Sequence, residues 1–150
     1  MTANAWQVFD IFYESLGAEL HKLNGVDTIK VALIDSGWTP ATATDVSFSV
    51  VDGDELATAN GYTAGGATAV MAWSAATGTL TCDTADVSWT ATDDGITARY
   101  AVVWNSSAGD TNDLICYSLL DSTDADVTAA AGVDFKINMN ASGLFTIAQS

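Results

Sequence analysis

Apart from its carboxylates, this chain has few side chains suited to catalysis or metal binding. It contains one histidine, His21, and two cysteines, Cys82 and Cys116. A serine or cysteine nucleophile needs a base beside it, and no nucleophile motif accompanies His21, which we interpret as a solvated residue at a helix end. One histidine and two distant cysteines also lack the usual spacing of zinc ligands. We therefore expect no enzymatic activity of these kinds.

Carboxylates are plentiful, but most stand in turn-like sequence. Acidic residues cluster at Asp52, Asp54 and Glu55, at Asp93 and Asp94, and at Asp121, Asp124 and Asp126. Aspartate in turns usually caps backbone groups and stays hydrated, so a glycosidase pair facing across a cleft is not indicated. Asp121, Asp124 and Asp126 offer three carboxylates within six residues and could bind calcium, although the familiar loop's glycine and terminal glutamate are missing. An ordinary acidic loop is the alternative, and we expect no cofactor.

The net charge limits the classes of partner. Four Lys and Arg stand against 19 Asp and Glu, giving a formal charge of −15. Phosphate backbones and anionic lipids are repelled by such a surface, so neither nucleic acid nor a membrane is an expected partner. The N-terminus lacks the basic and apolar parts of a secretion signal, so we expect synthesis in the cytoplasm and free thiols at Cys82 and Cys116. Residues 56–82 carry no charge, but their Gly and Thr content indicates β structure.

The N-terminal residues predict a short amphipathic helix over about 4–20. Aromatic and aliphatic side chains recur there at intervals of three and four, and Asn4 is a suitable N-cap. The helix could end at Gly17 or continue to about Leu23. Its apolar stripe must be covered, either by the domain's own sheet or by a neighbouring subunit. The stripe consists of Trp6, Phe9, Phe12, Tyr13, Leu16 and Leu20.

From about residue 26 onward the pattern is β, and we expect one domain over 1–150. Eight strands with turns between them predict a mainly β protein, a β-sandwich or jelly roll. The expected strands are 28–34, 68–75, 79–82, 86–91, 97–104, 114–120, 133–139 and 143–148. Alternation places Val87, Trp89 and Ala91 on one face, and groups Ala98 with Tyr100, Val102 and Trp104.

Three further features are candidates for contact with a partner. Residues 35–60 read as a long excursion with a helical turn near 54–57, and long ordered excursions tend to be functional. The glycine-rich segment 60–66 is either a second contact or simply a tightly packed turn. Arg99, the only arginine, lies in an apolar strand, so it forms a structural ion pair or contacts another subunit. The candidate partner contacts are Trp6, Phe9, Phe12, Tyr13, Trp38, Tyr62 and Arg99.

Several motifs, in this order, resemble a family of small virion structural proteins of tailed bacteriophages and prophages. They are DTIKVAL at 27–33, Trp38-Thr39-Pro40, NGYTAGG at 60–66, DTADVSW at 83–89, ITARYAVVW at 96–104 and ASGLF at 141–145. The resemblance implies a non-enzymatic protein similar to head decoration or cement proteins, which bind the outer surface of the capsid and stabilise it. It implies the major capsid protein and sister copies as partners, homo-oligomers such as trimers, and a virion location after synthesis in a bacterial host.

Two other functions remain open. A β-sandwich of this kind could belong to the tail or the head-tail connection. It could also be a carbohydrate-binding module, because exposed aromatic faces stack on sugars, and Trp38 and Trp73 are the tryptophans most available for that.

Overall fold

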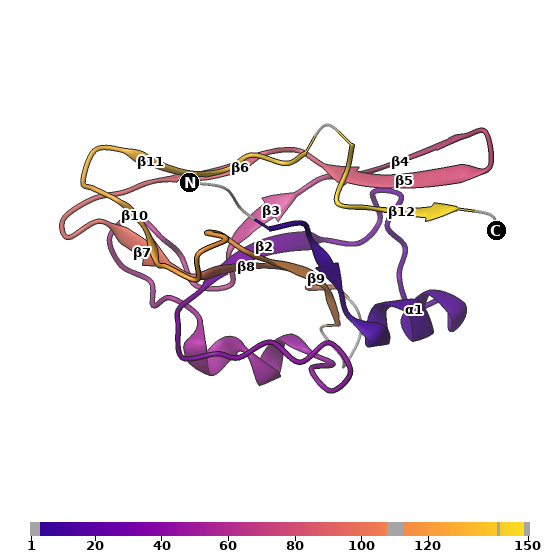
Figure 1. The fold of residues 1–150 in the computed structure, drawn as a ribbon, viewed down its shortest axis with the longest axis horizontal. Helices are drawn as coiled ribbons and strands as arrows, with labels where there is room; N and C mark the ends of the chain where they lie inside the picture. The colour runs from indigo at the N-terminus through magenta and orange to yellow at the C-terminus, as the bar shows by residue number, and fades with distance from the viewer. Residues whose placement is uncertain (1–3, 108–112, 141, 149–150) are drawn as a thin grey trace.

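The computed structural model describes residues 4–107, 113–140 and 142–148. It confirms a mainly β fold with a short helix near the N-terminus and several antiparallel sheets (Figure 1). The helical elements are α1 (Asp10–Gly17) and two short 3-10 turns, η1 (Phe48–Val50) and η2 (Asp52–Asp54). The strands are β1 (Gln7–Val8), β2 (Ile29–Ile34), β3 (Ala67–Ala69), β4 (Met71–Ala76), β5 (Thr79–Thr84), β6 (Val87–Thr90), β7 (Ile96–Ala98), β8 (Tyr100–Asn105), β9 (Leu114–Leu119), β10 (Val127–Ala129), β11 (Asp134–Ile137) and β12 (Phe145–Ala148).

A five-stranded antiparallel sheet with the order β1-β9-β8-β2-β3 lies at the centre of the molecule. Its middle strands β2, β8 and β9 are buried along nearly their whole length, which explains why their sequences are almost continuously apolar. Both faces of this sheet are covered, so the alternate side chains of each strand enter different cores.

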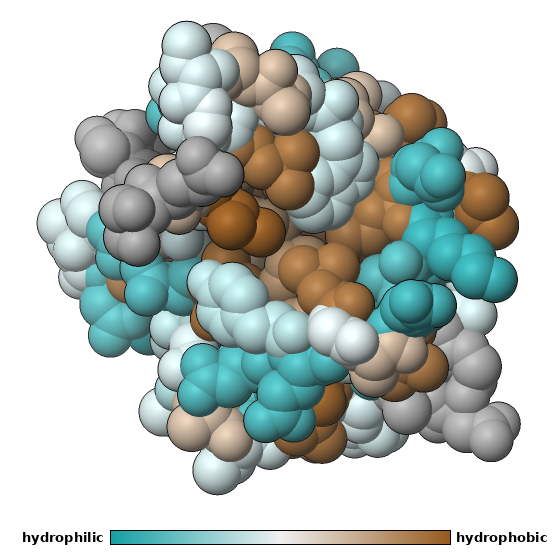
Figure 2. All heavy atoms as spheres, turned by 90° about the vertical axis from the view of Figure 1, so that its right-hand side faces the viewer, coloured by the Kyte–Doolittle hydropathy of each residue, from teal (hydrophilic) through white to brown (hydrophobic). Residues whose placement is uncertain are grey.

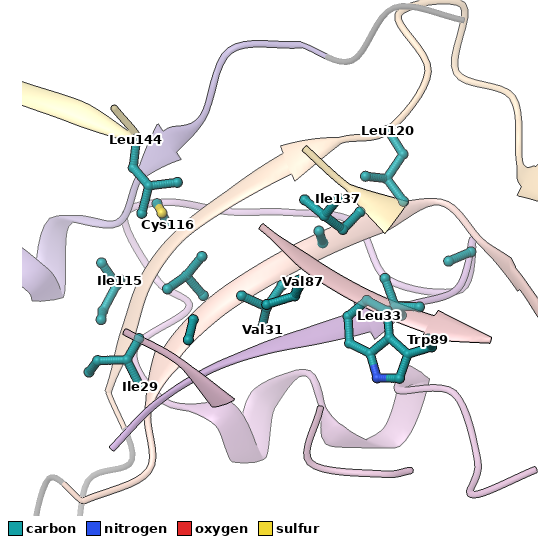
Figure 3. Close-up of a cluster of buried hydrophobic side chains, with 14 of the residues drawn as sticks. Ile29, Val31, Leu33, Val87, Trp89, Ile115, Cys116, Leu120, Ile137 and Leu144 are labelled. Atoms are coloured by element: carbon teal, nitrogen blue, oxygen red, sulfur yellow. The ribbon is translucent and has the colours of Figure 1, made fainter. Parts of the chain in front are cut away.

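The inner core lies between the central sheet and a second layer formed by β6 with β11 and by β4, β5 and β12. From the central sheet, Ile29, Val31 and Leu33 point into it, and Val87 and Trp89 of β6 approach from the opposite layer (Figure 3). Ala91 belongs to the same cluster, so the predicted shared face of residues 87, 89 and 91 is confirmed. This is the packing of a β-sandwich.

The outer face of the central sheet is covered by the long excursion after β2. Phe48 of η1 stacks on Trp104 of β8, with ring centroids 4.0 Å apart and an interplanar angle of 10°. Trp38 packs edge-on against Tyr100 and Tyr117 at 5.2 and 5.5 Å. The helical turn predicted at 54–57 lies slightly earlier, at η2. The excursion therefore forms a third layer of the protein's own fold.

The predicted helix over 4–20 is wrong in its first part. Residues 4–9 are extended: the amide of Asn4 donates to the carbonyl of Leu119, β1 pairs with β9, and the amide of Phe9 donates to the carbonyl of Ile115. Asn4 is therefore not the N-cap, and α1 begins only at Asp10. Pairing with β9 satisfies these backbone groups along a sheet edge, whereas a short isolated helix is only marginally stable.

The predicted face of Ala98 is also wrong, because the strand is interrupted at Arg99. The backbone of Arg99 bonds across to Ile34 and Leu120, β7 pairs with β10, and β8 pairs with β2. The interruption shifts the alternation by one residue. Ala98 therefore shares the inner core with Ala101, while Tyr100 lies against the outer core. The β10 strand that pairs with β7 was not predicted.

Candidate functional site

One end of the molecule carries a projecting arm built from β4, β5 and β12. We define the arm as residues 71–84 and 145–148, a three-stranded antiparallel sheet with the order β12-β5-β4. Its hairpin extends beyond the body of the sandwich, on the side of α1 (Figure 1). The turn at the tip is Thr77-Gly78, and both residues have positive φ, 47° and 80°. That is the two-residue turn that matches the twist of antiparallel strands.

The arm is almost free of charge in a strongly acidic protein. Asp83 is its one charged residue, and the whole run 56–82 has none, against a formal net charge of −15. Most side chains of β4 near the tip are small and exposed, and Ile147 of β12 is 40% exposed. Such a surface is poorly solvated compared with the rest of the molecule, as expected of an interaction site.

Two hollows adjoin the arm. One, of about 600 Å³, lies between β4 and the segment after α1, and is lined by Leu16, Leu23, Met71 and Trp73 among others. The second, of about 420 Å³, lies at the hairpin tip beside Leu80 and Ile147. Figure 2 shows this end of the molecule, where apolar side chains gather around a hollow and polar groups surround them. Tyr13 and Leu20, on and after α1, are 53% and 51% exposed.

A buried polar cluster holds the segment after α1 against the central sheet. Ser15 Oγ donates to Asp113 Oδ2 at 2.6 Å, and His21 Nε2 lies 3.8 Å from the same oxygen. Asn105 Nδ2 donates to His21 Nδ1 at 2.8 Å and to Asp27 Oδ2 at 2.7 Å. Ser15 is therefore bonded to the carboxylate and not to the imidazole, so the pair lacks the hydrogen bond on which activation of a serine nucleophile depends.

His21 is not the solvated residue that the sequence suggested. Its side chain is fully enclosed, at 0% exposure. Because α1 ends at Gly17 and Glu19 adopts a positive φ of 60°, the chain turns back and buries Leu23 together with the imidazole. Burial lowers the pKa of His21, although Asp113 and Asp27 oppose the shift, so the neutral form is favoured.

The NGYTAGG segment connects the excursion to the central sheet. Tyr62 Oη donates to Glu55 at 2.5 Å and accepts from the amide of Leu33 at 3.1 Å. The amide of Gly65 also donates to Glu55, at 2.6 Å. Gly66 has a φ of 77°, and a Cβ there would lie 2.6 Å from the carbonyl carbon of Val31. The residue types of this motif are therefore explained by close packing within the chain.

Four of the predicted partner contacts are covered by the protein itself. Phe9 and Phe12 are completely buried, and Trp38 and Tyr62 are 5% and 2% exposed. They cannot contact a partner without rearrangement of the cores, so the prediction fails for them. The reason is that β1, α1 and the excursion all pack on the central sheet.

The other three predicted contacts are more accessible. Tyr13 is exposed at the arm end, and Trp6 is partly buried beside a separate hollow of about 650 Å³. Arg99 Nε donates to Asp126 at 2.8 Å, and its Nη1 donates to Asp124 at 3.3 Å, as expected for a structural ion pair. Arg99 follows β7 and the two aspartates precede β10, and Figure 1 places these strands at the opposite end from the arm.

The suggested calcium ligands are used in other contacts. Asp124 and Asp126 accept from Arg99, and Asp121 accepts from Thr123. Within the described residues, no group of three His, Cys, Asp or Glu side chains is arranged to hold a metal ion. The carboxylates instead stabilise the loop before β10.

Both cysteines are free, as predicted, and both are buried. Burial raises the pKa of Cys82 to about 12 and raises that of Cys116 well above its ordinary value. Neither thiol is suited to act as a nucleophile, because the reactive thiolate is strongly disfavoured.

Sequence reasoning missed the arm as a site. Trp73 was one of the two tryptophans considered available to bind a sugar, but its side chain is partly buried against the inner core, and its indole N–H has no hydrogen-bond partner among the described residues. The signal was the absence of charge over residues 56–82, a stretch that the sequence analysis used only to indicate β structure. In the described part of the chain, no helix has the length and apolarity needed to cross a membrane.

No family model, curated protein or solved structure matches this chain.

Proposed function

We propose that this protein is a non-enzymatic structural component of a tailed-phage virion, similar to head decoration proteins, and that the arm end is its docking surface. The observation that carries the proposal is the arm: a nearly uncharged, partly apolar sheet projecting from a body whose formal charge is −15. A partner that covers this end buries apolar surface without having to desolvate many charges.

The rest of the molecule is suited to a structural role. Both faces of the central sheet are packed, and the excursion is fixed to it by Glu55, Tyr62 and the glycines of NGYTAGG. The acidic surface away from the arm favours solubility when many copies lie close together. Attachment of many rigid copies to a shell stabilises that shell by mass action, because each copy binds only the assembled form.

The experiment is to measure copy number in particles of the phage or prophage that encodes the chain. Quantitative mass spectrometry of purified virions should find about as many copies of this protein as of the major capsid protein. A ratio corresponding to a few copies per particle would instead support the tail or head-tail connection. Its absence from purified virions would refute both virion proposals.

A carbohydrate-binding function has one specific observation in its favour. The hollow of about 650 Å³ beside Trp6 is also lined by the amides Asn4, Asn138 and Asn140. Amides and an aromatic ring are the groups that neutral sugars bind. Binding to a glycan array, lost on replacing Trp6 with alanine, would favour this function over docking to a capsid.

A further inference from the structure

The imidazole of His21 lacks a partner at one of its two ring nitrogens. Its side chain is fully enclosed, and among the described residues Nε2 has no hydrogen bond. Asp113 Oδ2 lies 3.8 Å from Nε2, beyond hydrogen-bond distance, and already accepts from Ser15 Oγ at 2.6 Å. Buried polar groups are rarely left unpaired because each one costs stability, so this nitrogen points to a role beyond packing.

The other ring nitrogen, Nδ1, is fixed as an acceptor by Asn105. The Nδ2 group of Asn105 lies 2.8 Å from Nδ1 of His21 and 2.7 Å from Asp27 Oδ2, and its Oδ1 accepts from the amide of Ser107 at 2.9 Å. Turning the side chain round would set its oxygen against the carboxylate of Asp27 and its N–H groups against that of Ser107. The imidazole in the folded protein is therefore neutral, with its proton on Nε2.

A second proton on His21 does not fit this arrangement. It would sit on Nδ1 and point at the N–H of Asn105, so that a donor would face a donor. The ring would also carry a charge in an enclosed place, where the ring of Phe12 lies 5.3 Å away and the carboxylate of Asp113 is out of hydrogen-bond reach.

Two carboxylates face the imidazole from outside its own segment and oppose this effect. Asp113 precedes β9 and Asp27 precedes β2, and both attract a protonated ring. Asp113 is already bonded to Ser15, however, and Asp27 accepts from both Asn105 and the backbone amide of Lys22, at 2.7 and 2.6 Å. Neither carboxylate can reach Nδ1 unless Asn105 moves away from it.

The segment that carries His21 is held by few contacts. Residues 18–27 contain no helix or strand, and Leu23 is their one buried apolar side chain. Segments of this kind open locally at a lower free energy than the strands of a core. We propose that residues 18–27 form a latch that protonation of His21 releases while the sandwich stays folded. Because Leu23 lines the hollow beside β4, at the end of the molecule that Figure 2 shows, release opens the base of the arm.

The sign and size of the effect follow from proton linkage. Once released, His21 regains its ordinary pKa of 6.5, whereas burial lowers its pKa in the closed form. The open form therefore binds the proton more tightly, and acidification favours it. Between pH 7.5 and pH 5.5 the equilibrium constant for opening should rise about tenfold.

Hydrogen exchange of the wild-type protein, followed by NMR, tests the latch directly. The amides of Leu20, Lys22 and Asp27 are all hydrogen-bonded in the closed form. Their protection factors, which remove the intrinsic pH dependence of exchange, should fall about tenfold from pH 7.5 to pH 5.5. Low concentrations of urea should barely change them, because local opening exposes little surface. The amide of Gly95, which donates to the carbonyl of Thr92 in a turn without histidine, should keep its protection.

His21→Gln is the matched variant, because its side-chain oxygen can still accept from Asn105 but takes up no proton. Its segment should be equally protected at both pH values. In the wild type, the NMR titration of His21, the only histidine of the chain, should have a midpoint below 6.5.

A midpoint at or above 6.5 would overturn the proposal, as would protection factors of residues 18–27 that do not change with pH. The same fall in His21→Gln, or a urea dependence equal to that of β2 amides, would also overturn it. The titration and the exchange of the wild type decide the matter even if the variant does not fold. Neither measurement needs a virion, so the latch can fail or hold independently of the proposed function.

Discussion

Replacing Gly66 with alanine should destabilise the protein more than the same change at a glycine of equal conformation. Gly66 has a φ of 77°, and a Cβ there would lie 2.6 Å from the carbonyl carbon of Val31 and 2.8 Å from the Cα of Ala32. These atoms belong to β2, which is held on both sides by β3 and β8 and cannot easily move. The change therefore combines backbone strain with overpacking.

Gly132 separates the two contributions. Its φ is 81°, but no atom lies within 4 Å of a Cβ built on it. Gly132→Ala should therefore cost only the left-handed backbone term of about 1–2 kcal/mol. Gly66→Ala should cost about 1–3 kcal/mol more than that, from the contact with the backbone of β2.

The assay is urea unfolding followed by tryptophan fluorescence, with both variants and the wild type at the same protein concentration. Extrapolated free energies of unfolding with unchanged m-values would give the difference directly. Equal losses for Gly66→Ala and Gly132→Ala would refute the reasoning, because the proximity of the 60–66 segment to β2 would then have no energetic consequence.

Three further predictions concern groups inside the fold. Tyr62→Phe should lower the free energy of unfolding by about 1–3 kcal/mol, because the buried amide of Leu33 loses the hydroxyl that accepts its hydrogen bond. Adding Glu55→Gln should give a loss that differs from the sum of the two single losses, because Tyr62 donates to Glu55. Additive losses in this double-mutant cycle would contradict the coupling of the two side chains. Stability should fall as pH decreases below 6.5, the ordinary pKa of histidine, because the unfolded chain takes up a proton there that the enclosed His21, with its lowered pKa, does not. Thermal unfolding measured at several pH values below 6.5 should show that the melting temperature of His21→Gln depends less on pH than that of the wild type. An equal dependence in both proteins would contradict the attribution of this effect to His21. The thiols of Cys82 and Cys116 should react with a disulfide reagent only after the protein unfolds, so rapid reaction of the native protein would show that they are accessible.

The strands could largely be predicted from the sequence because their apolar runs are distinctive. IKVALI, YAVVWN and LICYSL are the three buried middle strands of the central sheet. The first and third were expected within one residue, whereas the strand expected at 97–104 is divided into β7 and β8. Apolar periodicity identifies strands that are buried on both faces, but it does not reveal how the strands pair.

The N-terminal error shows the limit of periodicity. Trp6 and Phe9 are three residues apart, as on one side of a helix, yet in the structure they enter opposite cores from an extended chain. The competing pairing with β9 depends on residues more than a hundred positions away, which no local pattern contains. The interruption at Arg99 could not be predicted for the same reason. It arises where the chain passes from β7, which pairs with β10, to β8, which pairs with β2.

The candidate site was harder to predict than the fold. Aromatic residues were the natural candidates for partner contacts, but a sandwich with both faces covered uses them in its cores, as Trp38 and Tyr62 show. The exposed residues of β4 in the arm are instead small and uncharged, and their importance appears only when β12 returns to pair with β5 and the arm is assembled.

The most direct test of the docking proposal compares two aspartate substitutions on opposite ends of the molecule. Ile147 lies on the arm and is 40% exposed, whereas Val133, before β11, is 53% exposed and lies at the other end (Figure 1). Each variant would be mixed with particles that lack the protein, and the bound fraction measured by co-sedimentation. The account predicts that Ile147→Asp loses binding while Val133→Asp binds like the wild type, with similar melting temperatures. Full binding by Ile147→Asp, or equal loss in both variants, would contradict it.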